Sequence, residues 1–261
     1  MISEIYTTAL VNPIFNVLMI FYKLFGNIGF SIIGLTAFVR LLSLPIMLPS
    51  IKSMRKQKEL QPQIDKIRKK FKHDKQKQAA EQMALMKQHG VNPASGCYSM
   101  IITIIIFTAL YSVIRQIIQA TDIASINTHL YLNFIKLSSL SQINTKFGYL
   151  DLTTKDPYFV LSILLGISQF IMAKMNMPYS KAGVEAAKKT PDKKDDIAYN
   201  MQQQSLYIMP FMMAMLGASM PSGVALYIMT STVFSIAQSY FVNGLGGLKP
   251  AVDKIKKWTK L

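Results

Sequence analysis

Apolar residues occur along the chain in long runs separated by strongly polar segments, a pattern that predicts several membrane-spanning helices. The hydrocarbon core of a bilayer is about 30 Å thick, so a spanning helix needs roughly 20 residues with few charges. Backbone groups left unpaired in lipid are costly, which makes helices the expected form of such segments. The sequence meets this length at residues 28–48, 96–116 and 157–177, and in a longer stretch, 204–243.

The longest apolar stretch predicts two helices. It is too long for one span and contains the turn sequence Met220-Pro221-Ser222-Gly223. We therefore divide it into a fourth helix at 204–220, which is short for a span, and a fifth at 221–243. The predicted fold class is an all-α integral membrane protein with a bundle of five transmembrane helices.

The N-terminal segment, residues 1–27, is apolar but is interrupted by Asn12, Pro13, Asn16 and Lys23. Such interruptions favour a helix that lies at the extracytoplasmic membrane interface. A membrane-spanning helix is the alternative for this segment. It has neither a basic n-region nor an obvious small-residue cleavage site, so we expect no removable signal peptide.

The distribution of charge predicts the orientation in the membrane. Residues 52–92 hold 12 Lys/Arg and 4 Asp/Glu, residues 174–203 hold 6 and 4, and residues from 244 onward hold 5 and 1, whereas residues 117–156 hold 3 and 3. Positively charged segments stay on the cytoplasmic side. In a plasma (inner) membrane, the N-terminus and the loop 117–156 would then be external. The segment 49–95, the loop 178–203 and the basic tail 244–261 would be cytoplasmic.

The first cytoplasmic segment, 49–95, predicts a helical hairpin. Its apolar positions recur at helical spacing in a first helix: Leu60, Ile64, Ile67 and Phe71. After a turn near His73, Asp74 is placed to cap a second helix that ends at Gly90. The apolar side of this second helix would carry Ala79, Met83 and Met86. The lysine-rich opposite face is either simply solvated or in contact with anionic headgroups or a partner.

Arg40 is the residue that most needs a physical explanation. If the first span is 28–48, Arg40 lies about 12 Å of helix rise from its cytoplasmic end. A charge at this depth costs roughly 2.5–3.5 kcal/mol. Its side chain leans toward the helix N-terminus, away from the nearer surface, and the five predicted spans contain no Asp or Glu. We therefore expect Arg40 to face water in a cavity open to the cytoplasm.

Other polar residues recur at helical spacing on neighbouring spans. Such stripes either form helix-to-helix hydrogen bonds or line a polar groove, and the presence of Arg40 favours a groove. The candidate substrate-binding groove consists of Arg40, Thr36, Ser43, Thr108, Ser112, Gln169, Tyr227, Ser231, Ser235 and Gln238. Five methionines near the fourth helix, Met209, Met212, Met213, Met215 and Met220, are either apolar filler or an adaptable surface for varied apolar segments.

Composition narrows the function classes. The chain combines 51% hydrophobic residues with 29 Lys plus Arg against 13 Asp plus Glu, which is typical of a membrane protein. Cys97 is the single cysteine, so an intrachain disulfide and a multi-cysteine metal site are excluded. We find no glycine-rich phosphate loop, no histidine pair at metal spacing and no nucleophile elbow. We expect no enzyme activity, no cofactor, no metal and no DNA partner.

Several segments, read in order, resemble the YidC/Oxa/Alb insertase family. They are Gly34 to Pro45 (GLTAFVRLLSLP), Met54 to Gln63 (MRKQKELQPQ), His89 to Pro93 (HGVNP), Gly96-Cys97, and Pro221 to Tyr227 (PSGVALY). The resemblance covers nearly the whole chain, and the order and spacing of the segments make it specific. One departure is Ile228, where members often have a second aromatic residue.

The resemblance implies a membrane protein insertase and chaperone with a hydrophilic groove open to cytoplasm and lipid. The motif arginine of the family falls on Arg40, which would receive the polar segment of a nascent membrane protein while its apolar segment leaves along the third and fifth helices. The implied partners are nascent membrane proteins, the lipid bilayer, the ribosome and the general secretion translocon. The alternative, a small-solute transporter or channel, would predict inverted repeats and paired intramembrane charges, which we do not find.

Overall fold

A computed structural model describes residues 2–71, 74–91, 95–120, 122–140, 143–176, 197–245 and 248–249. Residues 177–196, which include most of the predicted second cytoplasmic loop, and 250–261, most of the basic tail, lie outside the described residues. The same holds for His73 and for the side chains of residues 92–100, which include Cys97.

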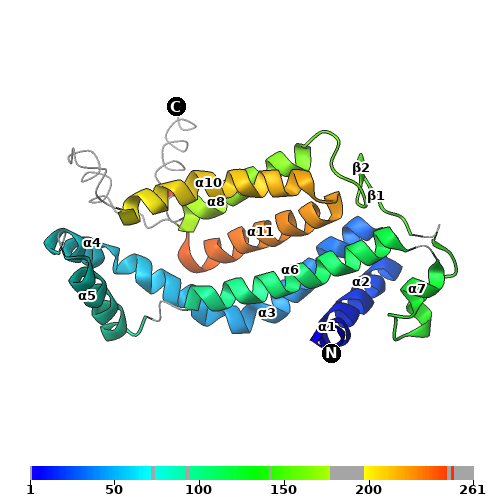
Figure 1. The fold of residues 1–261 in the computed structure, drawn as a ribbon, viewed down its shortest axis with the longest axis horizontal. Helices are drawn as coiled ribbons and strands as arrows, with labels where there is room; N and C mark the ends of the chain where they lie inside the picture. Colours follow the sequence, from blue (N-terminus) through cyan, green and yellow to red (C-terminus); the bar gives the residue numbers. More distant parts are fainter. Residues whose placement is uncertain are drawn as a thin grey trace. The chain divides into compact units, whose positions relative to one another are not determined.

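Helices make up most of the described chain (Figure 1). In chain order they are α1 (Ile2–Tyr6), the π-helical η1 (Thr7–Val11), α2 (Asn12–Phe25), α3 (Ile28–Glu59), α4 (Gln61–Lys70), α5 (Lys75–Gln88), α6 (Ser95–Gln119), α7 (Ile123–Asn127), the 3-10 helix η2 (Asn133–Ile135), α8 (Val160–Asn176), α10 (Ile197–Ser219) and α11 (Ser222–Asn243). Strands β1 (Lys146–Phe147) and β2 (Leu150–Asp151) form a short antiparallel pair, and the other described elements are helices, in agreement with the predicted all-α class.

Each predicted apolar segment contains a helix, although the third, 157–177, begins three residues before α8. The turn predicted at Met220-Pro221-Ser222-Gly223 is confirmed, because α10 ends at Ser219 and α11 begins at Ser222. Helix α3 begins at Ile28, where the first span was placed, but continues through Pro45 and Pro49 to Glu59. The chain therefore stays helical well beyond residue 48, where the predicted span ends.

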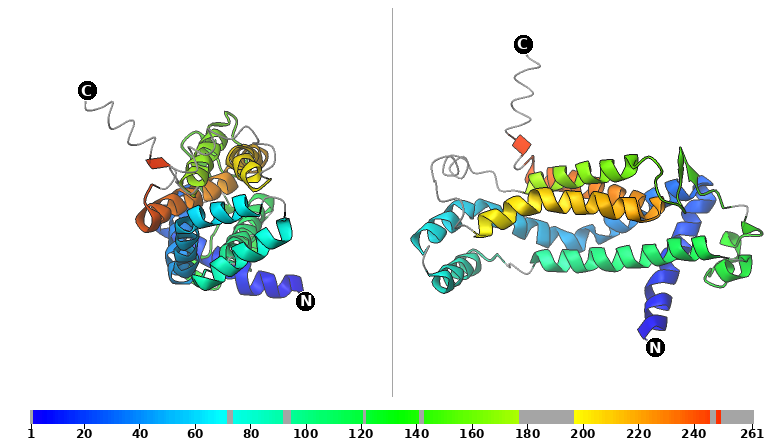
Figure 2. Two further views of the ribbon diagram at one scale, coloured as in Figure 1. Left: turned by 90° about the vertical axis from the view of Figure 1, so that its left-hand side faces the viewer. Right: turned by 45° about the horizontal axis from the view of Figure 1, so that its top comes forward.

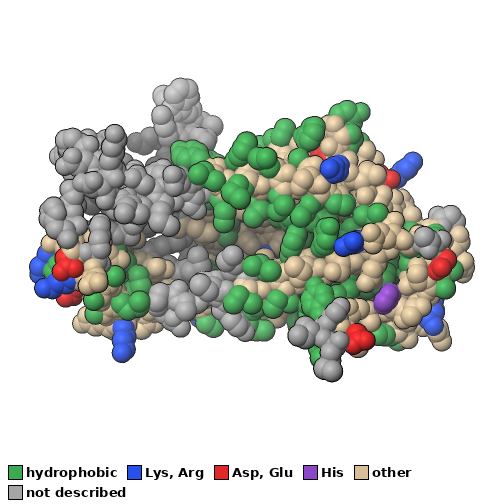
Figure 3. All heavy atoms as spheres, in the orientation of Figure 1, with side chains coloured by type: hydrophobic (Ala, Val, Ile, Leu, Met, Phe, Trp, Pro, Cys, Tyr) green, Lys and Arg blue, Asp and Glu red, His purple; other side chains and the backbone are tan. Residues whose placement is uncertain are grey.

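By length and composition, four described helical segments could cross a membrane: Glu4–Phe25, Ile28–Gln57, Ile101–Gln119 and Ser222–Val242. Two further apolar helices, Val160–Asn176 and Leu206–Ser219, are shorter. At 1.5 Å per residue a helix of 17 residues is about 25 Å long, less than a hydrocarbon core. Hydrophobic side chains gather over α8 and α10, whereas charged side chains of both signs lie at the end formed by α4 and α5 (Figure 3).

The chain divides into two compact units. Unit 1 comprises Met1–Ser43, Ile101–Gln169 and Pro210–Phe234, and unit 2 comprises Leu44–Met100, Phe170–Met209 and Ser235–Leu261. Five helices, α3, α6, α8, α10 and α11, contribute residues to both units.

The core of unit 1 forms where the N-terminal helix packs on α3, α6 and α11. Phe15, Leu18 and Ile32 are fully buried there, together with Val113 and Leu226. Helix α2 runs at a steep angle to α6 (Figures 1 and 2). The large apolar side chains of α2 therefore stabilise unit 1 by burial.

Two polar side chains tie α2 to residues that follow α6. The buried Asn16 donates to the carbonyl of His129 at 2.8 Å and accepts from the amide of Tyr131 at 2.7 Å. The hydroxyl of Tyr22 accepts from the amide of Asn144 at 2.9 Å. Asn16, which interrupts the apolar run in the sequence, thus satisfies backbone groups of a distant loop.

The β1–β2 segment joins the N-terminal ends of two helices in unit 1. Ile28 N–H donates to the carbonyl of Asn144 at 3.0 Å, Ser222 N–H to Thr154 at 2.7 Å and Gly223 N–H to Leu152 at 3.0 Å. These contacts satisfy amides that the first turns of α3 and α11 leave without helical partners. A Cβ on Gly223 would lie 3.0 Å from the Leu152 carbonyl oxygen, so the close approach favours glycine.

A hydrogen-bonded turn ends the β-strand pair. The carboxylate of Asp151 accepts from the hydroxyl of Thr153 at 2.6 Å and from its amide at 3.0 Å. These hydrogen bonds lower the pKa of Asp151, chiefly through the hydroxyl. The folded turn therefore favours the ionised carboxylate.

In unit 2, α4 and α5 pack on a small core of Leu60, Ile64 and Val91, with Leu85 and Met86 against it. The Asp74 cap is confirmed, because its carboxylate accepts from the amide of Lys77 at 2.9 Å. The predicted apolar side of α5 is wrong in part. Ala79 and Met83 are exposed, whereas Leu85 and Met86 face the core, because α4 packs against a different side of this weakly amphipathic helix.

Candidate functional site

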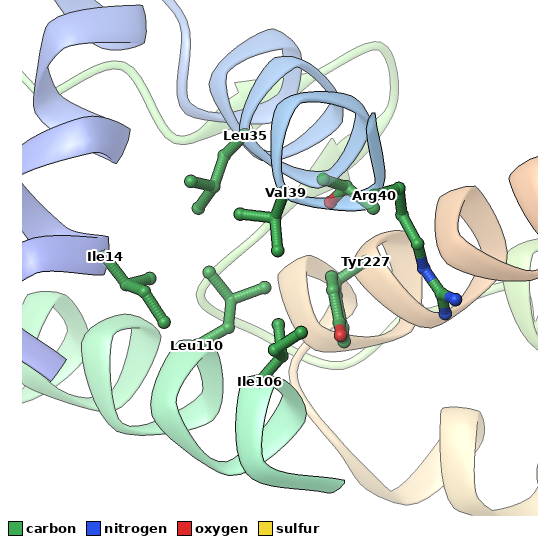
Figure 4. A pocket seen from close by; sticks show the side chains of 8 residues that line it. Ile14, Leu35, Val39, Arg40, Ile106, Leu110 and Tyr227 are labelled. Carbon is green, nitrogen blue, oxygen red and sulfur yellow. The ribbon is translucent and has the colours of Figure 1, made fainter. Parts of the chain in front are cut away.

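Arg40 lies in unit 1 on α3, 12 residues after the first residue of that helix, or about 18 Å along its axis. Its Nε donates to the Oγ of Ser231 on α11 at 2.9 Å, and its Nη2 contacts the same oxygen. Figure 4 shows the guanidinium group turned toward α11. The structure thus brings together two predicted groove residues that are 191 positions apart in the sequence.

A small cavity, partly open to its surroundings, lies beside Arg40 in unit 1. Four elements of unit 1, α2, α3, α6 and α11, supply its lining (Figure 4). Three predicted residues, Thr36, Arg40 and Tyr227, contribute to it. The remaining lining is aliphatic and was missed by the sequence analysis: Ile14, Leu35, Val39, Ile106 and Leu110. The cavity is therefore more apolar than a hydrophilic groove.

An aromatic row connects α6 to α11 beside the guanidinium. Tyr227, only 4% exposed, stacks on Phe107 with ring centroids 6.3 Å apart. Phe107 in turn stacks on Tyr111 at 6.4 Å. Tyr227 presents an apolar ring to the cavity, which it also lines together with Arg40.

Several predicted hydroxyl groups bond to their own helix. Thr36 donates to the carbonyl of Ile32 at 2.6 Å, Ser43 to that of Val39 at 2.7 Å and Ser112 to that of Thr108 at 2.9 Å. This i−4 bonding satisfies the hydroxyl proton without a partner helix. The oxygens of these groups remain able to accept a further hydrogen bond, but the residues do not need a wet groove to be satisfied.

Two other candidates make contacts between helices, the alternative interpretation of the polar stripes. The hydroxyl of Thr108 accepts from Tyr6 of α1 at 3.0 Å, so it meets the N-terminal helix and is not among the residues that line the Arg40 cavity. The amide of Gln169 on α8 donates to Thr232 on α11 at 3.0 Å. Thr232 was missed, although it directly follows the predicted Ser231.

The last two candidates, Ser235 and Gln238, belong to unit 2. The amide nitrogen of Gln238 is buried and has no hydrogen-bond partner among the described residues. A buried amide without a partner is costly, so this position favours a polar group or water that the described residues do not supply.

The electrostatics of the site are dominated by one cation. No described carboxylate lies within salt-bridge distance of Arg40; the ion pair on α3 is Arg55 with Glu59 at 3.1 Å, and it is exposed. A guanidinium has five N–H donors, and the contacts to Ser231 use only those on Nε and Nη2. Arg40 can therefore still donate to a carboxylate from outside the chain. Within the described residues, no group of three or more His, Cys, Asp or Glu could hold a metal.

Comparisons of this chain with known protein families and with individual proteins agree with one another. The family described as 60Kd inner membrane protein matches residues 20–247. The chain is 32% identical over 238 residues to the membrane protein insertase YidC of Wolinella succinogenes, which covers 91% of this chain but only 38% of that relative. The YidC insertase of Fusobacterium nucleatum is 30% identical over 220 residues, or 84% of this chain and 88% of that protein.

A solved structure is also similar. It is described as an active YidC insertase with its first transmembrane domain resolved, and it matches with a TM-score of 0.54 and 25% sequence identity. The match covers 88% of this chain and 46% of the other. The chain thus spans less than half of that structure, as it does of the Wolinella relative.

Proposed function

Because the chain belongs to the 60Kd inner membrane protein family, we propose that it is a membrane protein insertase that helps nascent membrane proteins enter and fold in the bilayer. The observation that carries the mechanism is Arg40, a cation within an apolar helix whose described partner is a neutral serine hydroxyl. Such a charge can attract the acidic tail of a client at a depth where a tail otherwise meets hydrocarbon.

The lining of the cavity beside Arg40 supports separate contacts for the polar and the apolar segments of a client. The guanidinium offers remaining N–H donors to a polar segment, while the aliphatic lining beside it suits an apolar one. Water near Arg40 would shorten the hydrocarbon path that a client tail must cross. Burial of the client's apolar span in lipid then supplies the driving force, so neither nucleotide nor cofactor is needed.

We also propose a topology of five spans: α8, α10 and α11 with the apolar parts of α3 and α6. The contacts of α2 support an interfacial N-terminal helix. Asn16, at the middle of Glu4–Phe25, is bonded to backbone groups of His129 and Tyr131 in the predicted external loop. If this helix crossed the membrane, these polar groups would lie near the centre of the hydrocarbon.

The remaining partners are proposed from charge. The basic tail, with Lys249, Lys254, Lys256, Lys257 and Lys260, suits salt-sensitive contact with ribosomal RNA or anionic lipid. The lysine-rich α4 and α5 would contact the incoming client. Where the protein acts together with the secretion translocon, this contact would occur beside the translocon.

Substitution of Arg40 tests the proposed mechanism. For clients whose tails carry zero, one or two Asp, we expect Arg40→Ala to lose insertion in proportion to the number of Asp. Arg40→Lys should retain much of the activity because it keeps the charge, and Arg40→Glu should be worst for acidic tails. Insertion is measured in proteoliposomes, normalised to folded insertase. A loss that is independent of tail charge would contradict the electrostatic role.

A further inference from the structure

Phe159, directly before α8, has a backbone conformation that phenylalanine rarely adopts. Its φ is +57°, the one positive φ of a non-glycine residue in the described chain. Bulky side chains are strained in this region, whereas glycine adopts it readily. Yet the Phe159 side chain is 54% exposed, so packing within the chain does not explain a large aromatic residue at this position.

The carboxylate of Asp156 holds this strained conformation in place. It is 2% exposed and accepts from the amide of Tyr158 at 3.0 Å and from that of Leu161 at 2.7 Å, on either side of Phe159. The hydroxyl of Tyr149 also lies 3.4 Å from this carboxylate. Strained residues persist where the surroundings over-determine them, and they cluster at functional positions.

The same hydrogen bonds set three aromatic side chains near the start of α8, which we name the aromatic patch: Tyr149, Tyr158 and Phe159. The rings of Tyr149 and Tyr158 are in contact, with centroids 5.7 Å apart, and all three residues are at least half exposed. The patch leads directly into the exposed apolar residues of α8, which are Val160, Ile163, Leu164 and Ile167. It therefore continues a surface that is suited to lipid.

We propose that the aromatic patch inserts into the headgroup region of the extracytoplasmic leaflet and sets the depth of α8 in the bilayer. Tyrosine and phenylalanine both have an apolar ring, and tyrosine adds a polar hydroxyl group. Such side chains suit the membrane interface. Helix α8 has 17 residues, or about 25 Å, so it needs an anchor where it falls short of the hydrocarbon thickness. The inference rests on the proposed topology, in which the patch is external.

Tryptophan fluorescence in liposomes tests the proposal. The single tryptophan of the chain, Trp258, is replaced by phenylalanine, and Phe159→Trp or Tyr158→Trp is introduced in turn. Phosphatidylcholine brominated near the carbonyl end of its acyl chains should quench both at least twice as strongly as Lys136→Trp. Lys136, an exposed, charged residue of the predicted external loop 117–156, serves as the control. Quenching at 158 and 159 no stronger than at 136 would overturn the proposal.

A second variant separates lipid contact from a role in folding. Phe159→Gly relieves the backbone strain, so its thermal midpoint in detergent should equal or exceed that of the parent. In liposomes, it should reduce the lipid quenching of Tyr158→Trp by at least half. A lower thermal midpoint in detergent, or unchanged quenching in liposomes, would contradict the anchor. Neither measurement requires a client, so a chain inactive in insertion would still report the depth of the patch.

Discussion

At the residue scale, the partly buried contact between Arg40 and Ser231 organises the candidate site. Arg40 could be identified in the sequence as a charge that needs compensation, but Ser231 could not be identified as its partner. Hydrogen bonds to a charged group contribute about 1.5–3 kcal/mol, more than those between neutral groups. The Arg40–Ser231 contact therefore stabilises the approach of α3 to α11 as well as orienting the guanidinium.

Removal of this contact is expected to be costly. We expect Ser231→Ala to lower the free energy of unfolding in detergent by about 1.5–3 kcal/mol, measured by denaturant titration. Ser231→Thr, which keeps the hydroxyl, should lose less. Thr230→Ala is the control, because Thr230 bonds only to the Leu226 carbonyl of its own helix at 2.8 Å among its described contacts. If Ser231→Ala is no less stable than the control, the contact contributes nothing to stability.

At the element scale, small residues determine how closely α8 approaches α10 in unit 1. A Cβ on Gly166 would lie 3.1 Å from the Cβ of Ala214 and 3.4 Å from the Pro210 carbonyl oxygen. Close approach through small residues is a common basis of helix packing in membranes, where lipid supplies no hydrophobic drive between helices. Gly166 is helical, so space and not backbone freedom explains the glycine.

A larger side chain at this position should separate the two helices. We expect Gly166→Leu to lower the thermal stability in detergent and to cost about 1–3 kcal/mol, because the backbone of α10 cannot yield as a flexible side chain would. Ile167→Leu, an exposed position on the same helix, should leave stability unchanged. Equal melting of Gly166→Leu and wild type would show that the contact is dispensable.

At the scale of the whole molecule, the distribution of lysine and arginine is the main determinant of orientation. Basic segments follow the first and third predicted spans and form the tail, whereas residues 117–156 are balanced in charge. The structure adds that Glu4–Phe25 is long and apolar enough to cross, although its contacts favour the interface. The number of spans therefore depends on this segment and on the two shorter apolar helices, Val160–Asn176 and Leu206–Ser219.

Accessibility reporters resolve the topology. Groups placed near residues 70 and 185 should be cytoplasmic, and groups near residue 140 and at the N-terminus external. A crossing Glu4–Phe25 would move the N-terminal reporter into the cytoplasm and leave the other three unchanged. A cytoplasmic reporter near residue 140 would instead contradict the five-span topology as a whole. Labelling of intact and permeabilised cells with a membrane-impermeant reagent provides the measurement and its control.

Features that depend on local patterns were predictable from the amino-acid sequence. Apolar length predicted the helical segments, the Met220–Gly223 sequence predicted the break between α10 and α11, and Asp74 was identified as a cap. The motifs around Arg40 predicted the family, which the comparisons confirm. Each of these signals depends on neighbouring residues or on spacing within one segment, so it can be read without knowing which helices pack together.

Contacts between segments that are distant in the sequence became visible only in the folded chain. It pairs Arg40 with Ser231, turns Thr108 toward Tyr6, and brings Ile14 to the same cavity as Tyr227. On apolar helices every side is compatible with either lipid or protein, so hydrophobic periodicity does not reveal which side packs. Serine and threonine can likewise bond to their own helix or to another. Partner choice therefore follows from packing, which no local pattern specifies.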